Sequence, residues 1–281
     1  MINALTIDVE DYFHVTAFEK YVKAEEWPQY PFRVSDNTMR ILDMLDEFRV
    51  KATFFVLAWV AERDPALVKE IRKRGHDIAC HGYAHELVYR IGPDRFRDDI
   101  RRARRILEDL CGAAVNGYRA PSYSITKASL WAFDILIEEG FTYDSSVFPI
   151  VHDIYGIPDA QRFPHAIERP AGVIKEFPMS TIQIRISGGE YRVPISGGGY
   201  LRLFPVGLIR RAIQHINRVE RQPAVLYFHP WEIDPAQPRI EASFRSRFRH
   251  YLNLDKTAGK VRDLLQGLTF GPMRSILYDA D

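Results

Sequence analysis

The sequence contains only two cysteines, Cys80 and Cys111, among its 281 residues. Two cysteines cannot build a disulfide framework, and such sparse usage is typical of a reducing compartment. The chain also lacks an apolar run long enough to span a bilayer, and Met1 to Asn3 lead into a predicted strand without the pattern of a signal sequence. We therefore expect a cytoplasmic protein with no membrane span.

An excess of charge of one sign is missing as well, because 38 lysines and arginines are balanced by 37 acids and the formal net charge is +1. A chain with this balance has no overall field that attracts nucleic acid or a membrane. Four arginines fall between positions 101 and 105, but apolar residues at helical spacing accompany them, which favours a solvated helix face over a binding patch. We expect no nucleic-acid partner.

What the sequence does contain is an alternation of apolar, strand-like runs with amphipathic helical segments. Strands are predicted at residues 2–9, 52–57, 76–80, 115–118 and 224–228, and helices at residues 35–48, 64–75, 93–110, 126–140, 206–219 and 257–268. Between residues 141 and 205 this alternation fades, and the predicted strands at residues 173–177, 181–186 and 191–195 fit hairpins inserted at one rim.

The alternation predicts an α/β fold with a parallel sheet or barrel, in which functional residues follow the carboxyl ends of the strands. Neither an internal repeat nor a linker divides the chain. We therefore expect a single domain over residues 1–281, with a C-terminal extension from about residue 233.

The first predicted strand ends in three acidic residues, Asp8, Glu10 and Asp11. Clustered carboxylates repel one another and are costly to bury unless a positive group lies between them. Taken alone, the cluster is equally well explained by a helix cap or a solvated turn. Histidines further along the chain add a second explanation, which is a metal site.

His81 and His85 follow the predicted strand at residues 76–80. Two histidines four positions apart lie on one face of a helical turn, where both imidazoles can reach one divalent ion. The spacing is common by chance, so the hypothesis depends on a third ligand from the acidic cluster. Two histidines and a carboxylate, with positions left for water and substrate, form the usual hydrolytic metal site.

Three further polar residues stand at or near predicted strand ends. His229 either satisfies a backbone carbonyl there or, beside a metal, serves as a general acid. Arg119 needs a carboxylate partner if it is buried, and Asp8 would be one. Asp144 either caps a turn or orients a histidine.

Taken in order, these segments resemble the five motifs of the NodB-homology polysaccharide deacetylases, also called carbohydrate esterase family four. The resemblance covers roughly residues 5–232 and is carried by Thr6-Ile7-Asp8, His81-x-x-x-His85, Arg119-x-Pro121, Asp144-Ser145-Ser146 and Leu226-x-x-His229. Five motifs in the same order are a stronger signal than any one of them. The segment Asp8–Phe13 and the tail from Pro230 resemble more narrowly the deacetylases of exosortase-associated exopolysaccharide loci.

The resemblance implies a distorted (β/α) barrel of about seven strands with inserted β-hairpins. It also implies one divalent metal, usually zinc, with His81 and His85 among its ligands. The resemblance also implies that Asp8 is the catalytic base and His229 the general acid. Arg119 would hold Asp8 in place, and Asp144 would adjust the pKa of His229.

The first motif departs from the two adjacent aspartates of the family, because Val9 separates Asp8 from Glu10. Side chains at positions i and i+2 of a strand point to the same side, which favours Glu10 as the third metal ligand. If the strand ends at Glu10, Asp11 could turn in instead. The sequence leaves this alternative open.

The implied function is metal-assisted removal of N-acetyl groups from an amino-sugar polysaccharide or its precursor, in exopolysaccharide or cell-envelope biosynthesis. A backbone N–H in the loop at residues 118–123 would stabilise the oxyanion. Tyr123 and Trp231 are candidates for stacking on sugar rings, as are Tyr12, Phe13 and Tyr200, although core packing is the default for aromatic side chains.

The expected partner is an N-acetylated amino-sugar polymer or oligosaccharide, and the sequence is compatible with a homo-oligomer. Two alternatives stay open. One is a metal-independent, allantoinase-like hydrolase of cyclic amides, and the other is a non-catalytic carbohydrate-binding relative. Retention of two histidines and an acid argues against the first, and the presence of every candidate catalytic residue argues against the second.

Overall fold

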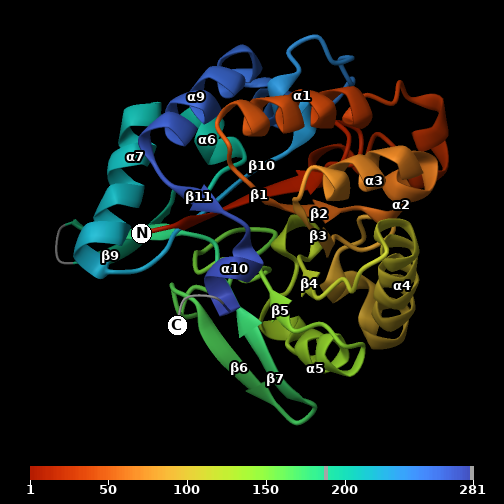
Figure 1. The fold of residues 1–281 in the computed structure, drawn as a ribbon, viewed down its shortest axis with the longest axis horizontal. Helices are drawn as coiled ribbons and strands as arrows, with labels where there is room; N and C mark the ends of the chain where they lie inside the picture. Colours follow the sequence, from red (N-terminus) through yellow and green to blue (C-terminus); the bar gives the residue numbers. More distant parts are fainter. Residues whose placement is uncertain (187–188, 279–281) are drawn as a thin grey trace.

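The computed structural model describes residues 1–186 and 189–278 of the chain. Its central sheet consists of β1 (Asn3–Val9), β2 (Thr53–Val56), β3 (Asp77–Cys80), β4 (Gly117–Tyr118), β5 (Tyr143–Asp144), β6 (His165–Arg169), β7 (Gly172–Glu176), β10 (Val225–Phe228) and β11 (Phe270–Gly271). The strand order is β10-β1-β2-β3-β4-β5-β7-β6, and β11 pairs with β1 (Figure 1). Neighbouring strands from β10 to β7 are parallel, whereas β6 is antiparallel to β7. A separate hairpin is formed by β8 (Thr181–Ile186) and β9 (Gly189–Pro194).

Helices surround this sheet (Figure 1). They are α1 (Val34–Glu47), α2 (Ala58–Arg63), α3 (Pro65–Lys73), α4 (Val88–Cys111), α5 (Trp131–Glu138), α6 (Gly199–Leu203), α7 (Val206–His215), α8 (Phe244–Tyr251), α9 (Leu254–Gly267) and α10 (Met273–Tyr278). In Figure 1, α1 and α3 lie beside the first two strands, α4 and α5 lie beside β3 to β5, and α6, α7 and α9 lie near β10. Among the described residues, no helix combines the length and the hydropathy that crossing a membrane requires.

The predicted α/β fold with a parallel sheet is confirmed. Within the described ranges no hydrogen-bonded ladder joins β6 back to β10, so the implied barrel is open at that side. The three strands predicted between residues 141 and 205 correspond to β7, β8 and β9. The sequence did not predict β6, because this edge strand is nowhere fully buried and its apolar pattern is weak.

Two helix starts differ from the predictions. α1 begins at Val34, and the backbone N–H groups of Arg33 and Val34 donate to the carboxylate of Asp11 rather than to a cap at the predicted start. α4 begins at Val88 rather than at residue 93, with a break at Gly92, whose φ of 76° lies in the left-handed region that glycine tolerates. α3 begins at Pro65, within one residue of the predicted start, and Asp64 caps it by accepting a hydrogen bond from the N–H of Leu67.

The carboxyl ends of the central strands are aligned by the register of the sheet. Val9 of β1 lies opposite Val56 of β2, which lies opposite Cys80 of β3. On the other side of β1, Ile7 lies opposite Phe228 of β10. All seven residues of β1 are buried. The residues that follow these strands therefore emerge at one rim, as the sequence predicted.

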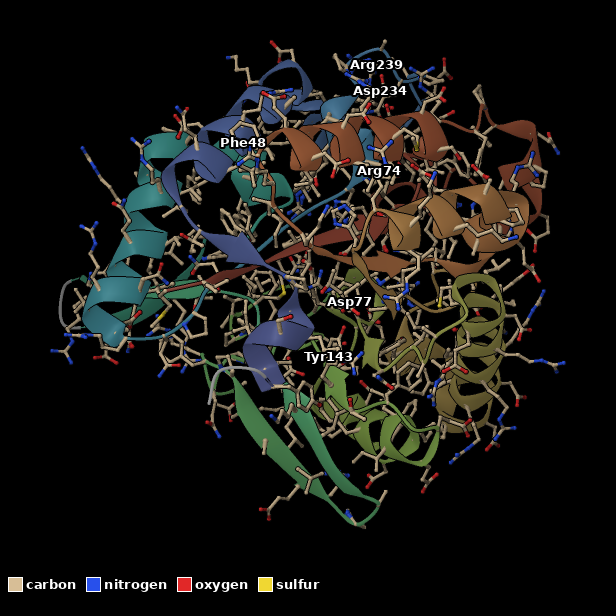
Figure 2. The ribbon with its side chains drawn as sticks, in the orientation of Figure 1. Phe48, Arg74, Asp77, Tyr143, Asp234 and Arg239 are labelled. Carbon is tan, nitrogen blue, oxygen red and sulfur yellow. The ribbon has the colours of Figure 1, made fainter. Side chains whose placement is uncertain are left out.

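The opposite ends of the strands have a structural role. Tyr143 Oη donates a hydrogen bond of 2.8 Å to Asp77 Oδ2, which ties β5 to β3 (Figure 2). The tyrosine ring passes so close to Gly117 that a Cβ atom at that position would lie 2.0 Å from Tyr143 Cζ. Only glycine leaves room for this contact.

Candidate metal and catalytic site

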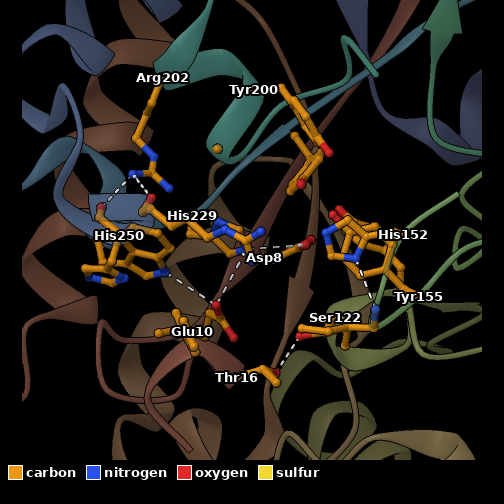
Figure 3. A pocket seen from close by; sticks show the side chains of 18 of the residues that line it. Asp8, Glu10, Thr16, Ser122, His152, Tyr155, Tyr200, Arg202, His229 and His250 are labelled. Atoms are coloured by element: carbon orange, nitrogen blue, oxygen red, sulfur yellow. Dashed lines mark hydrogen bonds and ion pairs between the residues drawn. The ribbon is translucent and has the colours of Figure 1, made fainter. Parts of the chain in front are cut away.

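A cavity of about 380 Å³ opens at the carboxyl ends of the central strands (Figure 3). It is lined by five of the predicted catalytic and metal-binding residues, which are Asp8, Glu10, His81, His85 and His229. Asp8 lies in β1 and Glu10 directly follows it, while His81 and His229 directly follow β3 and β10. The parallel arrangement thus brings together residues that are more than 200 positions apart in the sequence.

Glu10, His81 and His85 can hold a metal ion together. Each offers one ligand atom, and these atoms lie within 4.8 Å of one another. Glu10 Oε2 is buried without a hydrogen-bond donor, 2.7 Å from Nε2 of His85. Because a buried carboxylate oxygen normally has a partner, this orphaned atom fits a cation.

The protonation of His81 also suits a metal ligand. Its Nδ1 is 2.8 Å from the backbone oxygen of Arg119, and a carbonyl can only accept, so Nδ1 carries the proton and Nε2 keeps its lone pair. Burial lowers the pKa of His81 to about 4. The imidazole is therefore neutral near pH 7, as metal ligation requires.

The geometry that brings the two histidines together differs from the predicted helical turn. Residues 81–87 form a loop between β3 and α4. Gly82 has a φ of 74° and His85 a φ of 53°. These left-handed conformations turn the chain back on itself, so that the two imidazole centroids lie 5.5 Å apart.

Asp11 is turned away from this cluster, which corrects the alternative in which it is the third ligand. Its carboxylate accepts hydrogen bonds from the backbone N–H groups of Tyr12 at 2.9 Å, Arg33 at 2.6 Å and Val34 at 2.9 Å. Two of these donors belong to the start of α1, where a carboxylate is favoured by the helix dipole. Asp11 is therefore a helix cap, and Glu10 is the acid that faces the histidines.

We predict that Glu10→Gln loses bound metal and that Asp11→Asn keeps it. An amide is a poorer ligand for a divalent cation than a carboxylate, whereas Asp11→Asn weakens a cap and should reduce the free energy of unfolding by about 1 kcal/mol. Metal content after dialysis and thermal unfolding of both variants measure the two effects. The reverse pattern, with metal lost from Asp11→Asn alone, would place the third ligand at position 11.

The predicted pairing of Asp8 with Arg119 is present. Arg119 is fully buried, and its Nη1 donates to Asp8 Oδ1 at 2.6 Å and to Thr6 Oγ1 at 2.8 Å. Burial alone would lower the pKa of Arg119, but the negative charge of Asp8 raises it. Ser145 accepts two further hydrogen bonds from the guanidinium, from Nε to its backbone oxygen and from Nη2 to its Oγ. The pair is thus held in one geometry by several hydrogen bonds.

The carboxylate beside His229 is Glu232, which corrects the prediction that Asp144 tunes this histidine. His229 Nδ1 is 2.6 Å from Glu232 Oε1, and Arg202 Nε donates to Glu232 Oε2 at 2.7 Å. Asp144 instead accepts hydrogen bonds from the backbone N–H and the hydroxyl of Ser146. The signal for Glu232 was its position three residues after His229, the spacing of a capping box, which the structure contains.

His229 is placed to act toward the acids of β1. Its Nε2 lies 3.5 Å from Glu10 Oε1 and 3.9 Å from Asp8 Oδ2. Burial opposes the charged imidazolium, but the hydrogen bond to Glu232 and the charges of the nearby acids raise the pKa of His229 to about 9. The histidine is therefore protonated near pH 7 and can donate from Nε2.

Some of the predicted aromatic residues pack behind the site residues, and others line the cavity. Trp231 is 4 % exposed, stacks against His229 and His250, and donates from Nε1 to Glu10 Oε1 at 3.4 Å. It therefore positions the site rather than offering a free ring to a sugar. Tyr123 lines the cavity but is 6 % exposed, and Tyr12 and Phe13 belong to the core.

Tyr200, one of the predicted aromatic residues, lies in the cavity wall with Tyr155 and His152 (Figure 3). Sequence reasoning missed Tyr155 and His152, and also Tyr227, which lines the same wall. The ring of Tyr155 stacks on that of His152 at 3.8 Å. The glycines at positions 197–199 were a signal for this wall. A Cβ atom at Gly197 would lie 1.8 Å from the backbone oxygen of Tyr227, so the chain can approach that strand only without a side chain.

Two family models match the chain. Residues 26–135 match a family described as polysaccharide deacetylase, and residues 145–278 match a domain of unknown function, DUF3473. The first range contains His81, His85 and Arg119, and the second contains His229 and Glu232. Over residues 26–135 the chain is thus similar to the polysaccharide deacetylases.

Individual relatives agree with this assignment. The sequence is 40 % identical over 96 residues to a peptidoglycan-N-acetylglucosamine deacetylase of Bacillus cereus. The matched segment covers 34 % of this chain and 35 % of that protein. The match therefore spans about a third of the relative's length.

The fold is similar to that of a putative polysaccharide deacetylase from Mycobacterium smegmatis. The TM-score is 0.65 at 21 % identity, over 98 % of this chain and 88 % of the other. It is also similar to the fold of Puue allantoinase, with a TM-score of 0.59 at 14 % identity over 98 % and 88 % of the two chains. At these identities the likeness shows the fold alone.

Proposed function

We propose that the protein is a metal-dependent hydrolase that removes N-acetyl groups from an amino-sugar polysaccharide or its precursor. The observation that carries this proposal is the convergence of three groups on one cavity. They are the Glu10–His81–His85 cluster, the carboxylate of Asp8 and the imidazole of His229. The name of a relative, a peptidoglycan-N-acetylglucosamine deacetylase, supports an N-acetylated glycan as the substrate and the cell envelope as the setting. Exopolysaccharide biosynthesis is the other setting that we propose, on the resemblance of the sequence motifs.

Glu10, His81 and His85 would hold the metal, and we propose zinc because two histidines and one carboxylate are a common catalytic zinc set. When bound, a divalent cation there would polarise the acetamide carbonyl and make a nearby water molecule more acidic. Asp8 is placed to accept the proton of the attacking water. Arg119, whose Nη1 lies 2.6 Å from Asp8 Oδ1, holds this carboxylate in a fixed position.

His229 would deliver the proton that the leaving amine requires. Its Nε2 faces the acids at the end of β1, while its Nδ1 is held by Glu232. This arrangement fixes the orientation of the ring and favours the imidazolium form. The two proton transfers thus fall to different residues.

Ser122 is the residue of the predicted loop that we propose as the oxyanion donor. The N–H groups of Arg119, Ala120 and Tyr123 already donate to other acceptors, and Pro121 has no N–H. Among the described residues, neither a side chain nor a backbone carbonyl outside the helices and strands accepts a hydrogen bond from the N–H of Ser122. Ser122 also lines the cavity and has a φ of 50°, a strained conformation of the kind found at functional sites.

The proposal is tested by offering the metal-loaded protein both N-acetylglucosamine oligomers and allantoin. We expect acetate from the oligomers and no ring opening of allantoin. The reverse result would favour the allantoinase-like alternative, which the fold alone does not exclude. Binding of the oligomers without acetate release would favour a non-catalytic carbohydrate-binding role.

We predict that Glu232→Gln moves the high-pH limb of kcat/KM to lower pH. Glu232 raises the pKa of His229, and a general acid loses its proton as the pH rises through that pKa, so removing the charge lowers the pH at which activity falls. Asp144→Asn serves as the matched control. Asp144 accepts a hydrogen bond from Ser146 rather than from His229, so this variant should leave the high-pH limb of kcat/KM unchanged. A shift with Asp144→Asn alone would restore the original assignment of Asp144.

A further inference from the structure

The helix α8 exposes two phenylalanine rings to solvent. Phe244 is 84 % exposed and Phe248 is 52 % exposed, and their rings stack with centroids 6.2 Å apart. Residues four positions apart share one face of a helix, while His250 on the other side is buried. Exposed aromatic rings in contact form an apolar patch of the kind that marks an interaction site.

Arginines flank this pair of rings on both sides. At helical spacing Arg245 and Arg249 fall on one side of the rings and Arg247 on the other, and all three are exposed. Arg245 lies 3.5 Å from Asp153, whereas Arg247 and Arg249 form no ion pair with any residue that the structure describes. The helix is therefore locally basic, although the formal net charge of the chain is only +1.

α8 lies at the mouth of the catalytic cavity. Phe248 lines the cavity, as does Leu203, which is 52 % exposed. Arg202 fixes the helix to the site, because its Nη1 donates to the backbone oxygens of Arg249 and His250 while its Nε donates to Glu232 (Figure 3). A partner bound to α8 would thus lie beside the reacting groups.

We propose that α8 docks the protein on an anionic membrane surface, with the cavity opening at that surface. Phenylalanine rings beside arginines are the composition of helices that lie in the membrane interface, where the rings enter the acyl boundary and the guanidinium groups meet lipid phosphates. A neutral N-acetylated glycan would not account for the arginines, and its deacetylated product would be repelled by them. That the docked protein acts on a glycan held at this surface rests on the proposed function.

The test is sedimentation of the full chain with vesicles of phosphatidylglycerol and with vesicles of phosphatidylcholine. We expect binding to the anionic vesicles that weakens as salt is added, because exposed charges are screened. Phe244→Ser/Arg247→Gln should bind them roughly tenfold more weakly. The matched control is Val219→Ser/Arg105→Gln, which changes an exposed apolar residue and an exposed arginine elsewhere and should bind like the unaltered protein.

Equal binding by the two double variants, or no binding of the unaltered protein to phosphatidylglycerol, would overturn the proposal. Acetate release from a soluble N-acetylglucosamine oligomer is measured on the same preparations, and Phe244→Ser/Arg247→Gln should retain it. Loss of this activity with vesicle binding unchanged would instead make α8 a glycan-binding element. Vesicle binding without acetate release by the unaltered protein would contradict the proposed function and leave the docking surface standing.

Discussion

Asp8→Asn is expected to lower kcat for acetate release by roughly two to four orders of magnitude while the metal content stays near that of the unaltered protein. Asparagine keeps the size of the side chain and one hydrogen-bond acceptor for Arg119, but it cannot take a proton. The metal should remain, because the cluster formed by Glu10, His81 and His85 does not include Asp8. Metal analysis and steady-state kinetics on one preparation separate the two effects.

Stability must be measured alongside, because Asp8 neutralises a fully buried arginine. Removing one charge of a buried ion pair commonly costs about 3–5 kcal/mol, so a lower melting temperature is expected as well. Assays are therefore run well below that temperature. Loss of the metal from Asp8→Asn, with retention in Glu10→Gln, would show that the two acids have exchanged roles.

His229→Ala is expected to lower kcat on an N-acetyl substrate by roughly two to four orders of magnitude, again with the metal retained. The amine of an amide must be protonated as it departs, and His229 is the group placed to supply that proton. An acetyl ester should suffer less, because an alkoxide or phenoxide leaves with less need of a proton. The informative quantity is the ratio of the two losses.

Equal losses on amide and ester, together with a matching fall in melting temperature, would return His229 to a structural role at the end of β10. Trp231→Phe provides a comparison. It keeps an aromatic ring against His229 but removes the N–H that reaches Glu10, so it should weaken the site without a strong preference between the two substrates.

Much of the site could be predicted because its signals are local in the sequence. Acids at the end of a strand, histidines after another strand and a histidine after a third each mark a rim position once the sheet is parallel. The pairing of Arg119 with Asp8 followed from the cost of burying an unpaired charge. In each case a general rule restricted the choice to one or two residues.

The errors arose where two residues of the same chemistry competed. Asp144 and Glu232 could both support His229, and only the three-dimensional structure shows that β5 directs Asp144 toward Ser146. The sequence likewise left open whether Glu10 or Asp11 is the third metal ligand. Asp11 caps the helix α1, which starts 23 residues later, and no local sequence pattern predicts a cap at that distance.

The cavity wall was missed for a related reason. Tyr155 and Tyr227 lie far apart in the sequence; Tyr155 belongs to no motif, and Tyr227 occupies an unspecified position between Leu226 and His229. The position of this wall depends on the close approach of Gly197 and Gly198 to Tyr227 of β10, which glycine residues permit but do not by themselves predict. Long-range packing of this kind is not encoded in periodicity.

The most direct test of the central claim is a titration of zinc into protein stripped by a chelator, with acetate release from an N-acetylglucosamine oligomer followed at each step. The account predicts no acetate without metal, and a rate that rises with added zinc and levels off at one ion per chain. It also predicts that the stripped Glu10→Gln variant does not regain acetate release at the same zinc concentrations. Full activity of the stripped protein, or no acetate from protein carrying one zinc per chain, would contradict a metal-assisted deacetylase.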